Sequence, residues 1–87
     1  MKDKNFSGSV PVAVVARIYK KDPAWVRAGI IGGWLPIGLA TRNGRVITNV
    51  GEIDSRKGRI NYYISPMKLF EATGYLWEEG NEHNNKK

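Results

Sequence analysis

The sequence predicts a single small α+β domain in which two helices are followed by a β-hairpin and a third helix. Three observations support this prediction. A chain of 87 residues, of which 41% are hydrophobic, suffices for one core and no more. Apolar residues recur at helical spacing up to Gly33, and the period changes after it. Asn43-Gly44, a strong signal for a hairpin turn, lies in the middle of the chain.

The first helix is expected over residues 10–19. Ser9 is its expected N-cap, and Pro11 suits the first turn, where its missing N–H leaves no hydrogen bond unmade. One helical face, with the spacing i, i+3, i+4, i+7, is formed by Val12, Val15, Ala16 and Tyr19.

A second helix is expected over residues 23–32. Asp22 can cap its free N–H groups, and Pro23 suits its first position. Glycines 32–33 end it, because glycine adopts the left-handed C-cap conformation without strain. We expect Gly29 to permit close packing against the first helix.

This second helix has two different sides. Val26 and Ile30, at i and i+4, are expected to face the core. Ala24, Arg27 and Ala28 fall on another face, which we expect to be presented outward.

After Gly33 the pattern is typical of strands. Residues 34–41 are predicted to form an entry turn and a strand, and residues 45–48 a return strand, because Asn43-Gly44 tolerates the positive φ of a type I′ turn. Residues 49–58 are polar and are expected to form a long mobile loop. Residues 59–64 are rich in β-formers and should close the sheet.

Ser65-Pro66 repeats the cap-plus-proline signature and begins a third helix, expected over residues 66–73 and ended by Gly74. Its expected packing residues are Met67, Leu69, Phe70 and Thr73. Residues 75–77 are expected to fold back onto the core.

The order helix, helix, hairpin, helix is a winged helix-turn-helix arrangement, with residues 38–64 as the wing. The domain is expected to span residues 10–77. We expect residues 1–9 to be flexible and the polar tail 78–87 to be disordered.

Several classes of protein are excluded by composition. Cysteine is absent, and the single histidine, His83, lies in the polar tail, so neither a disulfide nor a cofactor or metal site is expected. Glu52 and Asp54 lack a third ligand. Residues 28–40 are uncharged but broken by four glycines and a proline, so we expect no membrane span. No secretory signal is apparent. A cytoplasmic, non-enzymatic binding domain is therefore predicted.

The positive charge belongs to the folded part of the chain. The formal net charge is +6, and residues 17–68 hold ten of the 14 basic residues but only three of the eight acidic ones. A basic folded surface is typical of nucleic-acid binders. The alternative is a solvated face that only keeps the protein soluble.

Four segments carry a resemblance to a known family. Residues 12–19 (VAVVARIY), 20–27 (KKDPAWVR) and 33–36 (GWLP) resemble the excisionase and MerR-type winged-helix family. Residues 59–66 (RINYYISP) resemble the second wing strand and following helix in small phage and mobile-element proteins of this kind. The resemblance covers about residues 10–74, with a wing longer than usual.

The resemblance implies binding to double-stranded DNA, with helix 23–32 in the major groove and wing 38–64 on the backbone or minor groove. Excisionase-like members are recombination directionality factors that bind arrays of sites and steer an integrase; other members regulate transcription. The expected partners are therefore duplex DNA and, for an excisionase, an integrase or recombinase or further copies of the chain on DNA.

Individual residues have expected roles in this interface. Ala24 and Ala28 allow the helix to approach base edges, and Arg27 can form a bidentate pair with guanine. Lys21 is expected to contact a phosphate. For Trp25 two alternatives are open, stacking on a sugar-phosphate or packing under the wing, and we favour packing. The basic wing residues expected to contact DNA are Arg42, Arg45, Arg56, Lys57 and Arg59.

Other functions remain open at this point. A phage DNA-packaging module of the small-terminase type would assemble into rings. A protein-interaction domain would use its basic face for an acidic partner and would not bind DNA at low salt. RNA binding has less support, because no strand carries enough aromatic residues for a stacking platform.

Overall fold

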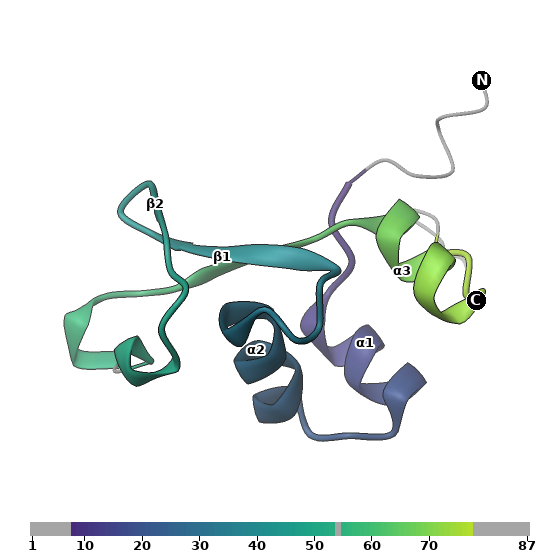
Figure 1. Cartoon of the computed structure of the whole chain (residues 1–87), viewed down its shortest axis with the longest axis horizontal. Coiled ribbons are helices and arrows are strands. Elements are labelled where there is room, and N and C mark those ends of the chain that lie inside the picture. Colours follow the sequence, from purple (N-terminus) through teal and green to yellow (C-terminus); the bar gives the residue numbers. More distant parts are fainter. Residues whose placement is uncertain (1–7, 54, 78–87) are drawn as a thin grey trace, which may run out of the picture.

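The computed structural model of the chain describes residues 8–53 and 55–77. These residues form a compact α+β domain with two N-terminal helices, a three-stranded antiparallel sheet and a C-terminal helix (Figure 1). The predicted α+β class is therefore confirmed. Most of the predicted flexible segment 1–9 and the whole predicted tail 78–87 lie outside the described residues.

Helix α1 (Val12–Tyr19) begins two residues later than predicted. Pro11, in an extended conformation, is its N-cap and provides no side-chain hydrogen bond. The prediction that Ser9 caps α1 is wrong, because Ser9 Oγ accepts a hydrogen bond from the Ile64 N–H at 3.1 Å. The Val10 N–H donates to the Ile64 carbonyl at 3.0 Å, so the chain entering α1 is held against the sheet.

Helix α2 (Pro23–Gly32) has the predicted bounds, and Gly33 ends it in the left-handed region at φ 86°. Asp22 is the N-cap residue, but its side chain makes no capping hydrogen bond. Its carboxylate can still stabilise the helix by its attraction to the positive, N-terminal end of the helix dipole. Lys20, in the connection from α1, also has a left-handed conformation, with φ 60°.

The sheet has the strand order β2-β1-β3, with β1 at Gly38–Arg42, β2 at Arg45–Val46 and β3 at Asn61–Ile64. Asn43 and Gly44 both have positive φ, 53° and 80°, as the predicted turn requires. β3 pairs antiparallel with β1, on the side opposite β2. β1 is therefore the central strand.

The segment that joins β2 to β3, residues 47–60, contains two short 3-10 helices, η2 (Val50–Glu52) and η3 (Ser55–Lys57). Asn49 Oδ1 accepts the Gly51 N–H at 2.8 Å and so caps η2. The predicted long loop of residues 49–58 therefore contains two short helical turns. The segment lies on the same side of the strands as α2 (Figure 1).

Helix α3 (Pro66–Thr73) has the predicted bounds. Ser65 Oγ accepts the Lys68 N–H at 3.2 Å, which is the predicted cap. Gly74 ends the helix at φ 81°.

The predicted packing of α3 is wrong for most of its residues. Leu69 is fully buried, but Met67 and Phe70 are 47% and 41% exposed, and Thr73 is also exposed. α3 lies at one end of the molecule (Figure 1), and its buried residues are Pro66 and Leu69. Of residues 75–77, only Trp77 folds back into the core.

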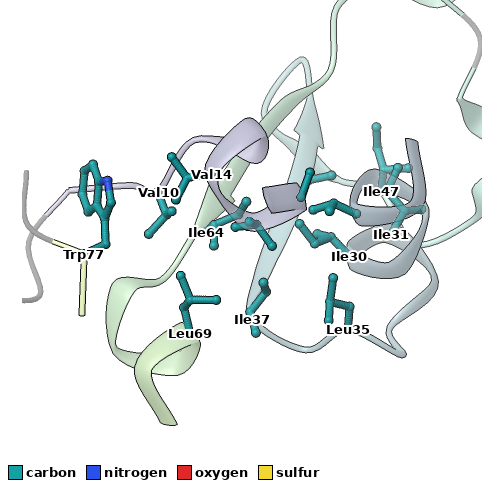
Figure 2. Packing of buried hydrophobic residues seen from close by; sticks show 14 residues of the cluster. Val10, Val14, Ile30, Ile31, Leu35, Ile37, Ile47, Ile64, Leu69 and Trp77 are labelled. Atoms are coloured by element: carbon teal, nitrogen blue, oxygen red, sulfur yellow. The ribbon is translucent and has the colours of Figure 1, made fainter. Parts of the chain in front are cut away.

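The core lies between the two N-terminal helices and one face of the sheet, and Trp77 closes it at the end near α3 (Figure 2). No helix of the described segments is long and apolar enough to cross a membrane. The buried hydrophobic residues are Val10, Val14, Val15, Ala16, Val26, Ile30, Ile31, Leu35, Ile37, Ala40, Ile47, Ile64, Leu69 and Trp77.

Candidate functional site

The surface of α2 that faces away from the core consists of small residues. Ala24, Ala28 and Gly32 follow at i, i+4 and i+8, so they form one row along the helix. Ala24 and Gly32 are exposed and Ala28 is half-buried. Arg27, which lies beside the row, is exposed. A flat partner surface can therefore approach the α2 backbone closely, next to one positive charge.

The opposite side of α2 fixes this orientation. Val26 and Ile30 are buried, as predicted. Ile31 is also buried, although it lies one turn after Arg27 and Ala28 on their own side of the helix. η2 packs against the end of α2, where Val50 Cγ2 lies 3.6 Å from the position that a Cβ on Gly32 would occupy. α2 is thus held between the core and the loop, with Ala24 and Arg27 exposed and Ala28 half-buried on its outward side.

An aromatic cluster flanks α2. The Trp25 ring lies 5.5 Å from the Tyr19 ring and 5.1 Å, edge to face, from the Trp34 ring. The Lys21 ammonium lies 5.6 Å from the centre of the Trp25 ring. Burial raises the pKa of the Tyr19 hydroxyl. Trp25 therefore packs, which is the alternative that we favoured, and the rings that it packs against are those of Tyr19 and Trp34.

Trp34 packs against α2, the alternative that the sequence favoured for it as for Trp25. Its ring lies over Gly29 and Gly32, and ring atoms are 2.9 and 3.0 Å from where Cβ atoms on these glycines would be. The prediction that Gly29 allows packing against α1 is therefore wrong, because its free space is filled by Trp34 and Leu35. Trp34 remains 53% exposed, held in place beside the row of small residues.

Arg42 is placed differently from the other predicted contact residues. Its side chain is only 10% exposed, and its Nη2 donates to the Glu52 carbonyl at 2.6 Å. The guanidinium is thus bonded to the loop and is not presented at the surface. The remaining predicted basic residues of the strands and loop are exposed: Arg45, Arg56, Lys57 and Arg59.

Positive charges from α2 and from β1 both act on a tyrosine of β3. Burial raises the pKa of the Tyr62 hydroxyl, and the positive charges of Arg27 and Arg42 act in the opposite direction by favouring the phenolate. Tyr62 is half-buried on the helix side of the sheet. The exposed arginine of α2 is therefore close to the sheet that carries the basic loop.

A hollow at the turn between α1 and α2 adds further positive charge. It is lined by Ala13, Ala16, Arg17, Lys20, Lys21, Asp22 and Pro23. Lys21 is exposed at its edge.

The other face of the sheet carries an apolar surface. Leu39 and Tyr63 are paired in register across β1 and β3, and they are 43% and 46% exposed. Alternation with the buried Ala40 and Ile64 is the signal that could have placed them outward. Beside them is a shallow groove lined by Pro36, Gly38, Leu39, Tyr63, Ser65 and Lys68.

Within residues 8–53 and 55–77, no three acidic or histidine side chains come close enough together to hold a metal ion. Asp54, the neighbour considered with Glu52, lies outside the described residues, as does His83. Comparisons with protein-family models, curated proteins and solved structures found no match to this chain.

Proposed function

We propose that this protein binds double-stranded DNA as a winged helix-turn-helix domain. α2 enters the major groove, and the wing of residues 38–64 lies along the backbone or an adjacent minor groove. The observation that carries the proposal is the exposed row of small residues on α2 beside Arg27. The resemblance of residues 10–74 to the excisionase and MerR-type family agrees with it.

The dimensions of α2 suit the groove. A helix with its side chains is about 10–12 Å across, and the major groove is about 12 Å wide. Ala24 and Ala28 carry no atoms beyond Cβ, so the backbone of the first two turns of α2 can lie deep in the groove. The Gly32 end of the helix is covered by the Trp34 ring. Alanine methyl groups can contact thymine methyls, and Arg27 can donate to O6 and N7 of one guanine.

Positive charge at both ends of this helix suits the phosphates. Lys21 precedes α2, and the loop that carries the exposed cations Arg56 and Lys57 packs against the other end of α2 through η2. Each phosphate contact releases condensed counterions, so a tenfold rise in salt concentration lowers the logarithm of the affinity by about 0.9 for each contact. Backbone contacts of this kind fix the position of the protein, while Arg27 supplies base recognition.

The proposed role is an accessory one in the cytoplasm. No nuclease or strand-transfer chemistry is proposed, so the protein acts by occupying and shaping DNA. The excisionase-like role, in which it directs a recombinase, and the role of a small transcription regulator share this interface. A footprint longer than one domain can cover, formed cooperatively, would favour the excisionase-like role.

The test is selection of bound duplexes from a random library, followed by titration between about 50 and 200 mM salt. We expect a preferred site and a steep loss of affinity with salt. Arg27→Ala should relax the preference at one base pair, worth about 1–3 kcal/mol. Lys68→Ala removes the same charge from α3 and serves as the control. Absence of duplex binding at low salt would refute the proposal.

The outer face of the sheet favours a second candidate, a protein-interaction domain. The groove beside Leu39 and Tyr63 is apolar and has Lys68 at its edge. Exposed apolar patches bordered by polar groups are typical of protein-binding surfaces. If the chain captures no duplex DNA, this candidate takes precedence.

A further inference from the structure

Arg42 differs from its partner across the hairpin. Arg42 and Arg45 are paired in register between β1 and β2 and carry the same charge. Arg45 is exposed, whereas the Arg42 side chain is almost completely covered. The difference lies in what the Arg42 guanidinium touches.

The Arg42 side chain is bonded to the first half of the loop formed by residues 47–60 and lies near the second half. Its Nη2 donates to the carbonyl of Glu52, the last residue of η2, at 2.6 Å. Its Cγ and Cδ lie 3.9 and 3.8 Å from the position of a Cβ on Gly58, near the other end of the loop. Gly58 has φ 115°, which residues with a Cβ rarely adopt. One side chain therefore links the outgoing and returning parts of the loop.

We propose that Arg42 is a positioning residue that holds the loop in one shape and thereby places the cations Arg56 and Lys57. In this proposal Arg42 does not contact DNA. Its effect on DNA binding rests on the proposed function, but its effect on the loop does not.

Glu52 takes part mainly through its backbone. Its carboxylate Oε1 lies 3.8 Å from Arg42 Nη1 and its side chain is 49% exposed, so this ion pair is weak. The hydrogen bond from a charged donor to the carbonyl is the stronger contact. Substitution of the Glu52 side chain should therefore matter much less than substitution of Arg42.

A preformed loop also changes what binding requires. A flexible segment of this length must lose conformational entropy when its cations meet phosphates. With the loop held in advance by Arg42, most of that loss is incurred on folding. Release of the loop should therefore weaken DNA binding even when no charge is removed.

The experiment compares Arg42→Lys, Arg42→Met, Glu52→Gln and the matched control Arg45→Met in the full chain. Brief trypsin digestion followed by mass spectrometry gives the cleavage rate after Arg56 and Lys57, relative to cleavage after Lys68 in α3. This ratio separates opening of the loop from unfolding of the whole domain. Titration with duplex DNA at several salt concentrations gives the affinity and the salt slope.

We expect both Arg42 variants to raise the loop cleavage ratio roughly tenfold, and Glu52→Gln and Arg45→Met to leave it unchanged. Arg45→Met should reduce the slope of log affinity against log salt concentration by the amount expected for about one phosphate contact. Arg42→Lys should bind DNA as weakly as Arg42→Met, although it retains the charge.

An unchanged cleavage ratio in Arg42→Lys would overturn the proposal, whether or not DNA binds. So would wild-type affinity in Arg42→Lys together with weak binding by Arg42→Met, because that pattern identifies Arg42 as a phosphate contact. If no variant and no wild-type protein binds duplex DNA while the cleavage ratio rises as expected, the proposed function fails and the positioning of the loop stands.

Discussion

Lys20 has a backbone conformation that suits glycine. Its φ is 60°, and Asn43 is the other non-glycine residue with positive φ among the residues described. The left-handed region costs a residue with a Cβ about 1–2 kcal/mol, part of which a glycine loses again as entropy on folding. We expect Lys20→Gly to raise the free energy of unfolding by about 0.5–1 kcal/mol in urea titrations. Lys21→Gly removes the same charge without relieving a positive φ, and should lower stability.

Gly38 is required for a different reason, the close approach of β1 to β3. A Cβ at this position would lie 2.8 Å from Ile64 Cα and closer still to the Tyr63 carbonyl oxygen. Backbone atoms cannot move aside, so Gly38→Ala should destabilise the fold by about 3 kcal/mol or more. Gly33→Ala meets no atom within 4 Å and should lose only about 1–2 kcal/mol from its positive φ. Equal losses in thermal or urea unfolding would contradict this distinction.

At the scale of the element, α3 offers a direct test of its orientation. Leu69 is fully buried, so Leu69→Ala should destabilise the domain by about 2–5 kcal/mol. Met67, two residues earlier and 47% exposed, should tolerate alanine within about 0.5 kcal/mol. Urea unfolding of both variants measures the difference. A larger loss for Met67→Ala would mean that the other side of α3 faces the core.

The bounds of elements were predictable where local signals set them. Proline at the first helical position, after Asp22 in α2 and after Ser65 in α3, together with Gly33 and Gly74, marks helix ends through short-range backbone chemistry. Ser9 shows the limit of such signals. Its hydroxyl is bonded to Ile64, 55 residues away, and no local pattern reports a contact of that range.

The same limit applies to the candidate site. The outward row of Ala24 and Ala28 follows from helical periodicity and the burial of Val26, both visible in the sequence. The burial of Arg42 was not predictable, because it depends on how residues 47–60 fold back over the hairpin. Basic residues near a glycine-rich turn have the same pattern whether they hold a loop or face solvent.

Considered as a whole, the molecule has two different faces. Within the described part of the chain, α1 and α2 cover one face of the sheet, and no helix covers the other (Figure 1). The helix side carries Arg27 and is adjacent to the basic loop, whereas the open side carries the apolar pair of Leu39 and Tyr63. In the proposed function, DNA binds to the helix side and the open face of the sheet stays accessible.

This separation predicts that substitutions on the two faces act independently. Tyr63→Thr keeps a good β-former at an exposed position, so duplex affinity should stay within about twofold. Arg27→Ala should lower affinity for the preferred site by roughly tenfold or more. Fluorescence-anisotropy titrations at constant salt measure both, with circular dichroism to show that each variant is folded. If Tyr63→Thr weakens binding as much as Arg27→Ala, the nucleic acid lies across the open face of the sheet, and α2 is not the element that enters the groove.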